Sequence, residues 1–93
     1  MKIIVYQNVF CNDSEDIDNH LVIKKQYESD VIPHIGETIY NFMYKDNTES
    51  KVADVAYNFD NNTCDITLEK MVIEYSKDNI KQLAQYHDWE VIG

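Results

Sequence analysis

Apolar and polar residues alternate with a period of two along most of this chain, which predicts β-strands for the larger part of it. Lys2–Phe10 is rich in Ile, Val, Tyr and Phe, and its residues 3–6 are apolar on both faces, as expected of a central strand. His20–Glu28 resumes the alternation, although Lys25 falls on the apolar face. An inward lysine is typical of edge strands, so we expect this segment at an edge.

Three further segments continue the pattern. Residues 38–45 place Tyr40, Phe42 and Tyr44 on one face, where we expect them to pack in the core. Residues 51–60 place Val55, Tyr57 and Phe59 on one face, and the other face holds Asp54, Ala56, Asn58 and Asp60. After a turn at residues 60–62, Cys64, Ile66 and Leu68 alternate with Asp65, Thr67 and Glu69. The last two segments predict a β-hairpin with Asp65, Thr67 and Glu69 facing outward.

The pattern changes after residue 68. The apolar positions shift parity across Glu69 and Lys70, which predicts a bulge or a break there. Ser76 is then expected to cap a short helix over residues 77–87, with Ile80, Leu83, Ala84 and His87 on one stripe. A short strand or extended tail over residues 89–92 closes the chain.

These elements predict one α+β domain over residues 1–93, with an antiparallel sheet or small open β-barrel of about five strands and one short C-terminal helix. With two Gly and one Pro in the sequence, Asn and Asp must serve most turns. Asp30 to Gly36 is expected to be a connection, because Pro33 cannot donate a ladder hydrogen bond and Gly36 permits a positive φ.

Residues 31–68 resemble small SH3-like β-barrel proteins of bacteria and phages. The resemblance rests on Pro33-His34-Ile35-Gly36-Glu37, on the spacing Val52-x-x-Val55-x-Tyr57 and on Ile66-x-Leu68. It implies a barrel-like fold for this part of the chain and no site residues.

Charge adds a function class to this picture. The chain has 17 Asp and Glu against 8 Lys, no Arg and a net charge of −9. Phosphate neutralisation by Lys and Arg supplies most nucleic-acid affinity, so direct nucleic-acid binding is not expected. The acids fall in a cation-free stretch at residues 13–18 and on the outward positions of the strands after residue 50.

Carboxylates on a strand face lie about 6.6 Å apart along the strand, close to the spacing of neighbouring phosphates in a nucleic-acid backbone. We therefore expect a basic, nucleic-acid-binding protein as the partner, and the chain as an inhibitor of a host defence or nucleic-acid-processing protein, encoded for example by a phage or mobile element. The expected partner-binding residues are Asp13, Glu15, Asp16, Asp18, Asp54, Asp60, Asp65, Glu69 and Glu74. The oligomeric state stays open.

Other chemistry finds little support in the sequence. No two of the three His and two Cys lie within five residues of each other, the stretch from Asp13 lacks an EF-hand glycine, and no glycine flanks a candidate nucleophile. We therefore expect no enzyme, metal or cofactor. The two cysteines are expected as unpaired thiols in a cytoplasmic protein without export signal or membrane span. The alternative function is a small-ligand or protein-binding barrel with a pocket around Tyr40, Phe42, Tyr44 and Tyr57, its acidity being incidental.

Overall fold

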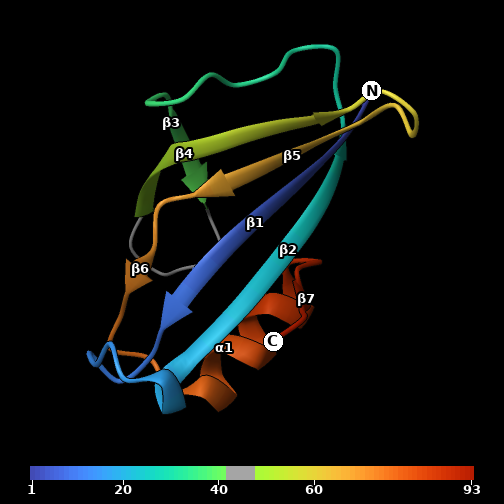
Figure 1. Cartoon of the computed structure of the whole chain (residues 1–93). Coiled ribbons are helices and arrows are strands. Elements are labelled where there is room, and N and C mark those ends of the chain that lie inside the picture. The colour runs from blue at the N-terminus through green and yellow to red at the C-terminus, as the bar shows by residue number, and fades with distance from the viewer. Residues whose placement is uncertain (42–47) are drawn as a thin grey trace.

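The structure is a computed structural model that describes residues 1–41 and 48–93. Long strands dominate it, and one short helix follows them (Figure 1). The elements are β1 (Lys2–Phe10), a 3-10 turn (Ile17–Asn19), β2 (His20–Glu28), β3 (Thr38–Asn41), β4 (Thr48–Asn58), β5 (Thr63–Leu68), β6 (Met71–Val72), α1 (Lys77–Tyr86) and β7 (Glu90–Val91). The predicted hairpin, the break at Glu69 and Lys70, the helix and the final short strand are thus confirmed.

The strands form one curled, mixed sheet in the order β3-β4-β5-β1-β2-β7, and β6 continues the β5 side of β1. A small open barrel therefore describes the fold, but the expectation of an antiparallel sheet of about five strands is wrong. The described residues form seven strands, and the central strand β1 runs parallel to both β5 and β6. Alternation predicts strands but carries no information on which distant segment pairs with β1, because that pairing is non-local.

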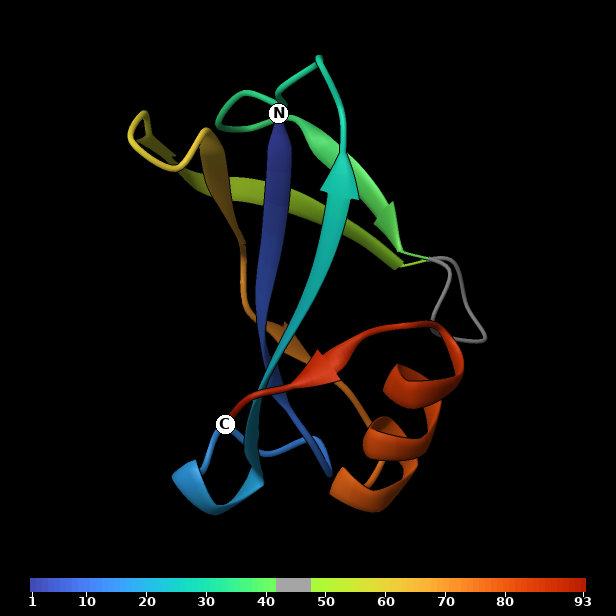
Figure 2. The same cartoon turned by 90° about the vertical axis from the view of Figure 1, so that its right-hand side faces the viewer.

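The core lies on the concave face of this sheet. Ile3, Val5 and Val9 of β1 are buried there beside Leu21, Ile23, Cys64, Ile66 and Leu68 from the neighbouring strands. Figure 2 shows α1 and β3 on the same side of the β1–β2 ribbon, with α1 below. Ile80 and Ala84 of α1, together with Trp89, complete the core at that end.

Two side-chain hydrogen bonds across the concave face were not expected from the sequence. Gln7 of β1 and Ser50 of β4 are both buried, and the Gln7 amide donates to the Ser50 hydroxyl at 2.8 Å. Lys25 does point to the apolar face as predicted, and its Nζ donates to the backbone carbonyl of His87 at 2.9 Å. This lysine therefore binds the end of α1, where a cation also complements the helix dipole. The short strand β7 pairs with β2 at Ile23 and Lys24. Among the described residues, the rest of the outer side of β2 has no strand partner.

Asn, Asp and Gly occupy turn positions among the described residues, as predicted. Asn12 and Asp13 have positive φ values of 57° and 51°, and Gly36 has a φ of 89°. Of the predicted row Tyr40, Phe42 and Tyr44, the last two lie outside the described residues, and the structure does not describe the side chain of Tyr40. Among the described residues, no helix has the length and apolarity that a membrane crossing requires.

The N-terminal cap of α1 gives a direct stability test. The Ser76 hydroxyl accepts a hydrogen bond from the backbone N–H of Asn79, as the sequence predicts for an N-cap. Ser76→Ala should lower the free energy of unfolding by about 1 kcal/mol, measured by urea titration. Gln82→Ala on the exposed face of the same helix is the control, with an expected change below about 0.5 kcal/mol. Equal effects of the two substitutions would show that the cap contributes nothing.

Candidate protein-binding surface

The nine carboxylates predicted as partner-binding residues lie in three places. Residues 13–18 form the loop after β1, and Glu74 follows β6 beside that loop, because the N–H of Asp13 donates to the carbonyl of Ile73. Asp54 and Asp65 lie on the convex face of the sheet, and Asp60 lies in the β4–β5 turn. Glu69 is exposed between β5 and β6. The structure therefore separates the predicted set into groups and does not gather it into one patch.

The loop group lies beside cations. Lys70 contacts Glu15 at 2.5 Å, and the positive charge of Lys77 acts on the Cys11 thiol at the start of the loop. The expectation of a cation-free stretch holds for the sequence of residues 13–18 and is wrong for the folded protein. The reason is that Lys70 comes from a segment 55 positions later along the chain.

The group on the β4–β5 hairpin is different. In the part of the chain that the structure describes, none of the ion pairs involves Asp54, Asp60 or Asp65. Asp54 pairs with Thr67 and Asp65 pairs with Ala56, so the two carboxylates are diagonal neighbours on the same face. Such neighbours lie about 7–8 Å apart, and like charges at this spacing repel each other. We name Asp54, Asp60 and Asp65 the hairpin acids.

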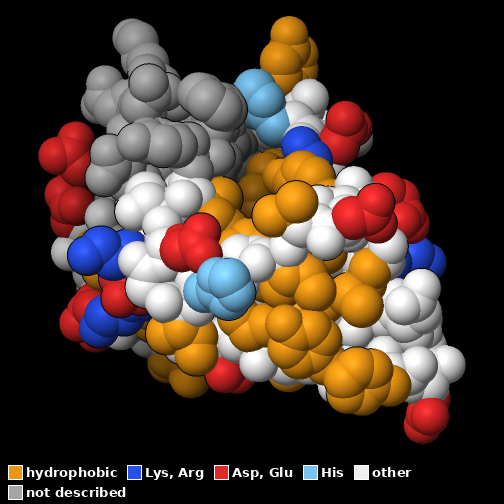
Figure 3. All heavy atoms as spheres, turned by 90° about the horizontal axis from the view of Figure 1, so that it is seen from above, with side chains coloured by type: hydrophobic (Ala, Val, Ile, Leu, Met, Phe, Trp, Pro, Cys, Tyr) orange, Lys and Arg blue, Asp and Glu red, His pale blue; other side chains and the backbone are white. Residues whose placement is uncertain are grey.

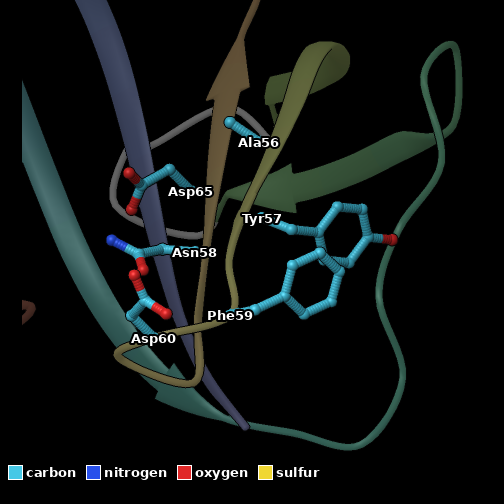
Figure 4. Close-up of a pocket in the computed structure, with 6 residues that line it drawn as sticks. All are labelled: Ala56, Tyr57, Asn58, Phe59, Asp60 and Asp65. Atoms are coloured by element: carbon cyan, nitrogen blue, oxygen red, sulfur yellow. The ribbon is translucent and has the colours of Figure 1, made fainter.

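The other face of the hairpin is aromatic. The rings of Tyr57 and Phe59 stack with their centroids 5.9 Å apart. Figure 4 shows these two rings on one side of β4, while Asn58, Asp60 and Asp65 point to the other side. A shallow hollow of about 440 Å³ is lined by residues from both sides: Ala56, Tyr57, Asn58, Phe59, Asp60 and Asp65.

The aromatic rings share the predicted face with Val55 but are not buried. Tyr57 is 50% exposed and Phe59 is 84% exposed, whereas Val55 is partly buried. The helix covers the far end of the concave face, and Phe59 lies beyond the end of β4. Alternation thus identified the shared face correctly. It could not show that Tyr57 and Phe59 stay exposed among the described residues, because their exposure depends on where the other segments lie.

Seen from above, the same end of the molecule exposes further apolar side chains. Figure 3 shows hydrophobic side chains gathered there, with acidic side chains around them. The β2–β3 connection and the β4–β5 turn both lie at this end (Figure 1). Exposed apolar residues in the connection are Val31 and Ile35, and Phe59 is exposed in the turn. Glu28 and Asp30 both lie 3.8 Å from the backbone nitrogen of Met1, so these acids belong to the same end.

The cysteines and histidines lie elsewhere. Cys11 and Cys64 are buried, unpaired thiols, as predicted, and burial raises the pKa of both thiols. This shift is opposite to the one that activates a cysteine nucleophile. His34 is exposed, and its backbone N–H and ring lower the pKa of Glu37. Among residues 1–41 and 48–93, no three His, Cys, Asp or Glu side chains are grouped as metal ligands.

We compared the chain with protein-family models, curated proteins and solved structures, and none of the three comparisons found a match. The SH3-like resemblance of residues 31–68 therefore stays a prediction.

Proposed function

We propose that this protein is a small acidic binding module whose hairpin acids contact a basic protein partner, such as the nucleic-acid groove of a host defence or nucleic-acid-processing protein. The observation that carries this proposal is the pair Asp54 and Asp65, which share one sheet face as diagonal neighbours and take part in none of the ion pairs of the described residues. Their repulsion costs folding stability, and a cationic partner would remove that cost.

Two further features support the proposal. Diagonal neighbours on a sheet are about 7–8 Å apart, which is similar to the spacing of successive backbone phosphates that a nucleic-acid groove accepts. The net charge of −9 also accelerates encounter with a basic surface by electrostatic steering. In this proposal the protein acts as an inhibitor, because it occupies the groove in place of the nucleic acid. A phage or mobile element is a source consistent with such a role.

Affinity capture tests this function. The tagged protein is incubated with a bacterial cell lysate at low and at high salt, and retained proteins are identified by mass spectrometry. We expect basic, nucleic-acid-binding proteins at low salt, a steep loss of capture as salt increases, and release of the partner by added duplex DNA.

Two results would contradict the proposal. Capture that is insensitive to salt would mean that apolar contacts and not charges hold the partner. Capture that duplex DNA does not reverse would mean that the partner binds away from its nucleic-acid groove. A single-stranded RNA competitor extends the test to grooves that do not accept duplexes.

A further inference from the structure

Among residues 1–41 and 48–93, no strand pairs with the outer edge of β4 along its second half. Thr38 to Asn41 of β3 pair with residues 48–51 of β4, and Val52 exchanges backbone hydrogen bonds with Gly36 and Glu37. Beyond the bulge between Val52 and Asp54, the described residues pair β4 only with β5, up to Asn58. The backbone of residues 54–58 therefore presents hydrogen-bonding groups on the edge opposite β5.

The two faces beside this open edge have opposite chemistry. On the convex face, Asp54, Ala56 and Asn58 alternate along β4, and Asp65 lies directly beside Ala56. On the concave face, Val55 and Tyr57 alternate and Phe59 stacks on Tyr57. A strand added to the edge would present its successive side chains to these two faces in turn, because side chains alternate across a sheet.

This alternation determines the sequence pattern of the fitting partner. We propose that the edge of β4 at residues 54–58 binds an extended segment of a cationic protein by strand addition, and that Lys or Arg alternates with apolar residues along that segment. The apolar side chains contact Tyr57 and Phe59, while the cationic side chains contact the hairpin acids. The inference rests on the proposed function and names its mode of recognition.

A cationic side chain of the added strand has to pass over Ala56 of β4 to reach Asp65 on β5. A cation opposite Ala56 lies about 10 Å from Asp65, which corresponds to two strand spacings. The small side chain of Ala56 leaves the path over β4 free for a long Lys or Arg side chain. A bulky residue at this position would block that path, so both Asp54 and Asp65 are within reach of one added strand.

The negative charge beside the β4 edge favours a cationic strand over a second copy of the chain, a nucleic acid, a membrane or a neutral strand. A second copy of the chain would bring another net charge of −9 and its own hairpin acids to the same edge. A nucleic acid or an anionic membrane would meet the same repulsion. A neutral apolar strand would leave the hairpin acids without counterions, so the basic and apolar alternation is the complementary pattern.

Synthetic peptides test the inference without knowledge of the natural partner. The probe is a labelled eight-residue peptide of alternating Lys and Val, and its binding to the full chain is followed by fluorescence anisotropy. A peptide with the same composition in two blocks, four Lys followed by four Val, keeps the charge and removes the alternation. A third peptide keeps the alternation and carries N-methyl groups on every second amide, which removes donors along one peptide edge. A fourth is N-methylated on the other amides.

We expect the alternating peptide to bind about tenfold more tightly than the block peptide and than one of the two N-methylated peptides, because several main-chain hydrogen bonds are lost. In ¹⁵N-labelled protein the amide shifts should concentrate on residues 54–58. Tyr57→Ser with Phe59→Ser should weaken binding of the alternating peptide. Tyr86→Ser, which changes an aromatic residue on α1 that is as exposed as Phe59, should not.

The failures are distinguishable. Equal binding of all four Lys–Val peptides would overturn strand addition and leave charge-driven binding of the proposed function intact. If no peptide binds while salt-sensitive capture from lysate persists, this inference fails and the proposed function stands. A dimer in sedimentation analysis that Phe59→Ser converts to a monomer would show that the occupant is a second copy, which also overturns the inference.

Discussion

Ile66→Ala should lower the free energy of unfolding by about 3 kcal/mol and the Tm by about 12 °C or more. Ile66 has no exposed surface and lies in β5 between Val5 of β1 and Val55 of β4. Its removal leaves a cavity in the core between β1 and β4, and close-packed neighbours relax only partially into such a cavity. Urea titration followed by tyrosine and tryptophan fluorescence measures the change.

The matched control is Ile4→Ala. Ile4 is also an isoleucine in a strand next to β5, but it lies on the convex face opposite Asp65 and is only partly buried. We expect its replacement to cost about 1 kcal/mol. A small domain of this size has a total stability of roughly 5–10 kcal/mol, so the Ile66 variant is expected to remain folded at 25 °C. A cost below 1 kcal/mol for Ile66→Ala would show that the core does not continue through β5.

The second large effect concerns binding. The double substitution Asp54→Lys and Asp65→Lys should reduce affinity for the captured partner about tenfold or more, since two attractions become repulsions. This double substitution cannot test the repulsion between the two carboxylates, because the two new lysines also repel each other. Asp54→Asn with Asp65→Asn is therefore the variant for stability, and it should unfold at a slightly higher urea concentration than the wild type.

The acidic loop supplies a control with the same change in net charge. Asp16→Lys with Asp18→Lys shifts the net charge by the same amount at the other end of the sheet. Asp65 pairs with Ile4, and Asp54 is level with Tyr6, so four to six residues of β1 lie between these acids and Phe10 at the start of the loop. That is about 13–20 Å along the strand, more than the Debye length of about 8 Å at physiological salt. We expect the loop variant to retain most of its affinity. Equal losses would show that overall charge and not the hairpin determines binding, and a loss only in the loop variant would transfer the site to residues 13–18.

Local features of the fold could be predicted from the sequence, because they depend on neighbouring residues. The hairpin turn after Asn58, the break at Glu69, the Ser76 cap and the burial of Cys64 and Ile66 all follow from patterns a few residues long. The central position of β1 could also be predicted, since a strand apolar on both faces has to be covered on both.

Non-local features could not be predicted. The parallel neighbours of β1 come from residues 63–72, and nothing in the local pattern identifies them. Lys25 was expected to protect an edge, and instead it binds a carbonyl 62 positions away.

The candidate site was predictable to the same extent. The outward positions of Asp54 and Asp65 follow from alternation. Their absence from the ion pairs of the described residues does not, since it depends on where distant lysines lie in the fold. The same limit explains the loop acids, whose neighbour Lys70 becomes visible only in the folded chain. The exposure of Phe59 likewise depends on where α1 and the loops lie.

The parallel pairing of β1 with β5 and β6 has a consequence for how the chain is made. The ribosome synthesises β1 before β5 and β6, and these strands, which cover its second edge, follow some 60 residues later. Until then β1 has only β2 to pair with, and one edge of the most apolar strand is exposed. Folding of the nascent chain therefore has to wait for the second half, and the order of synthesis leaves a period during which this strand is prone to aggregation.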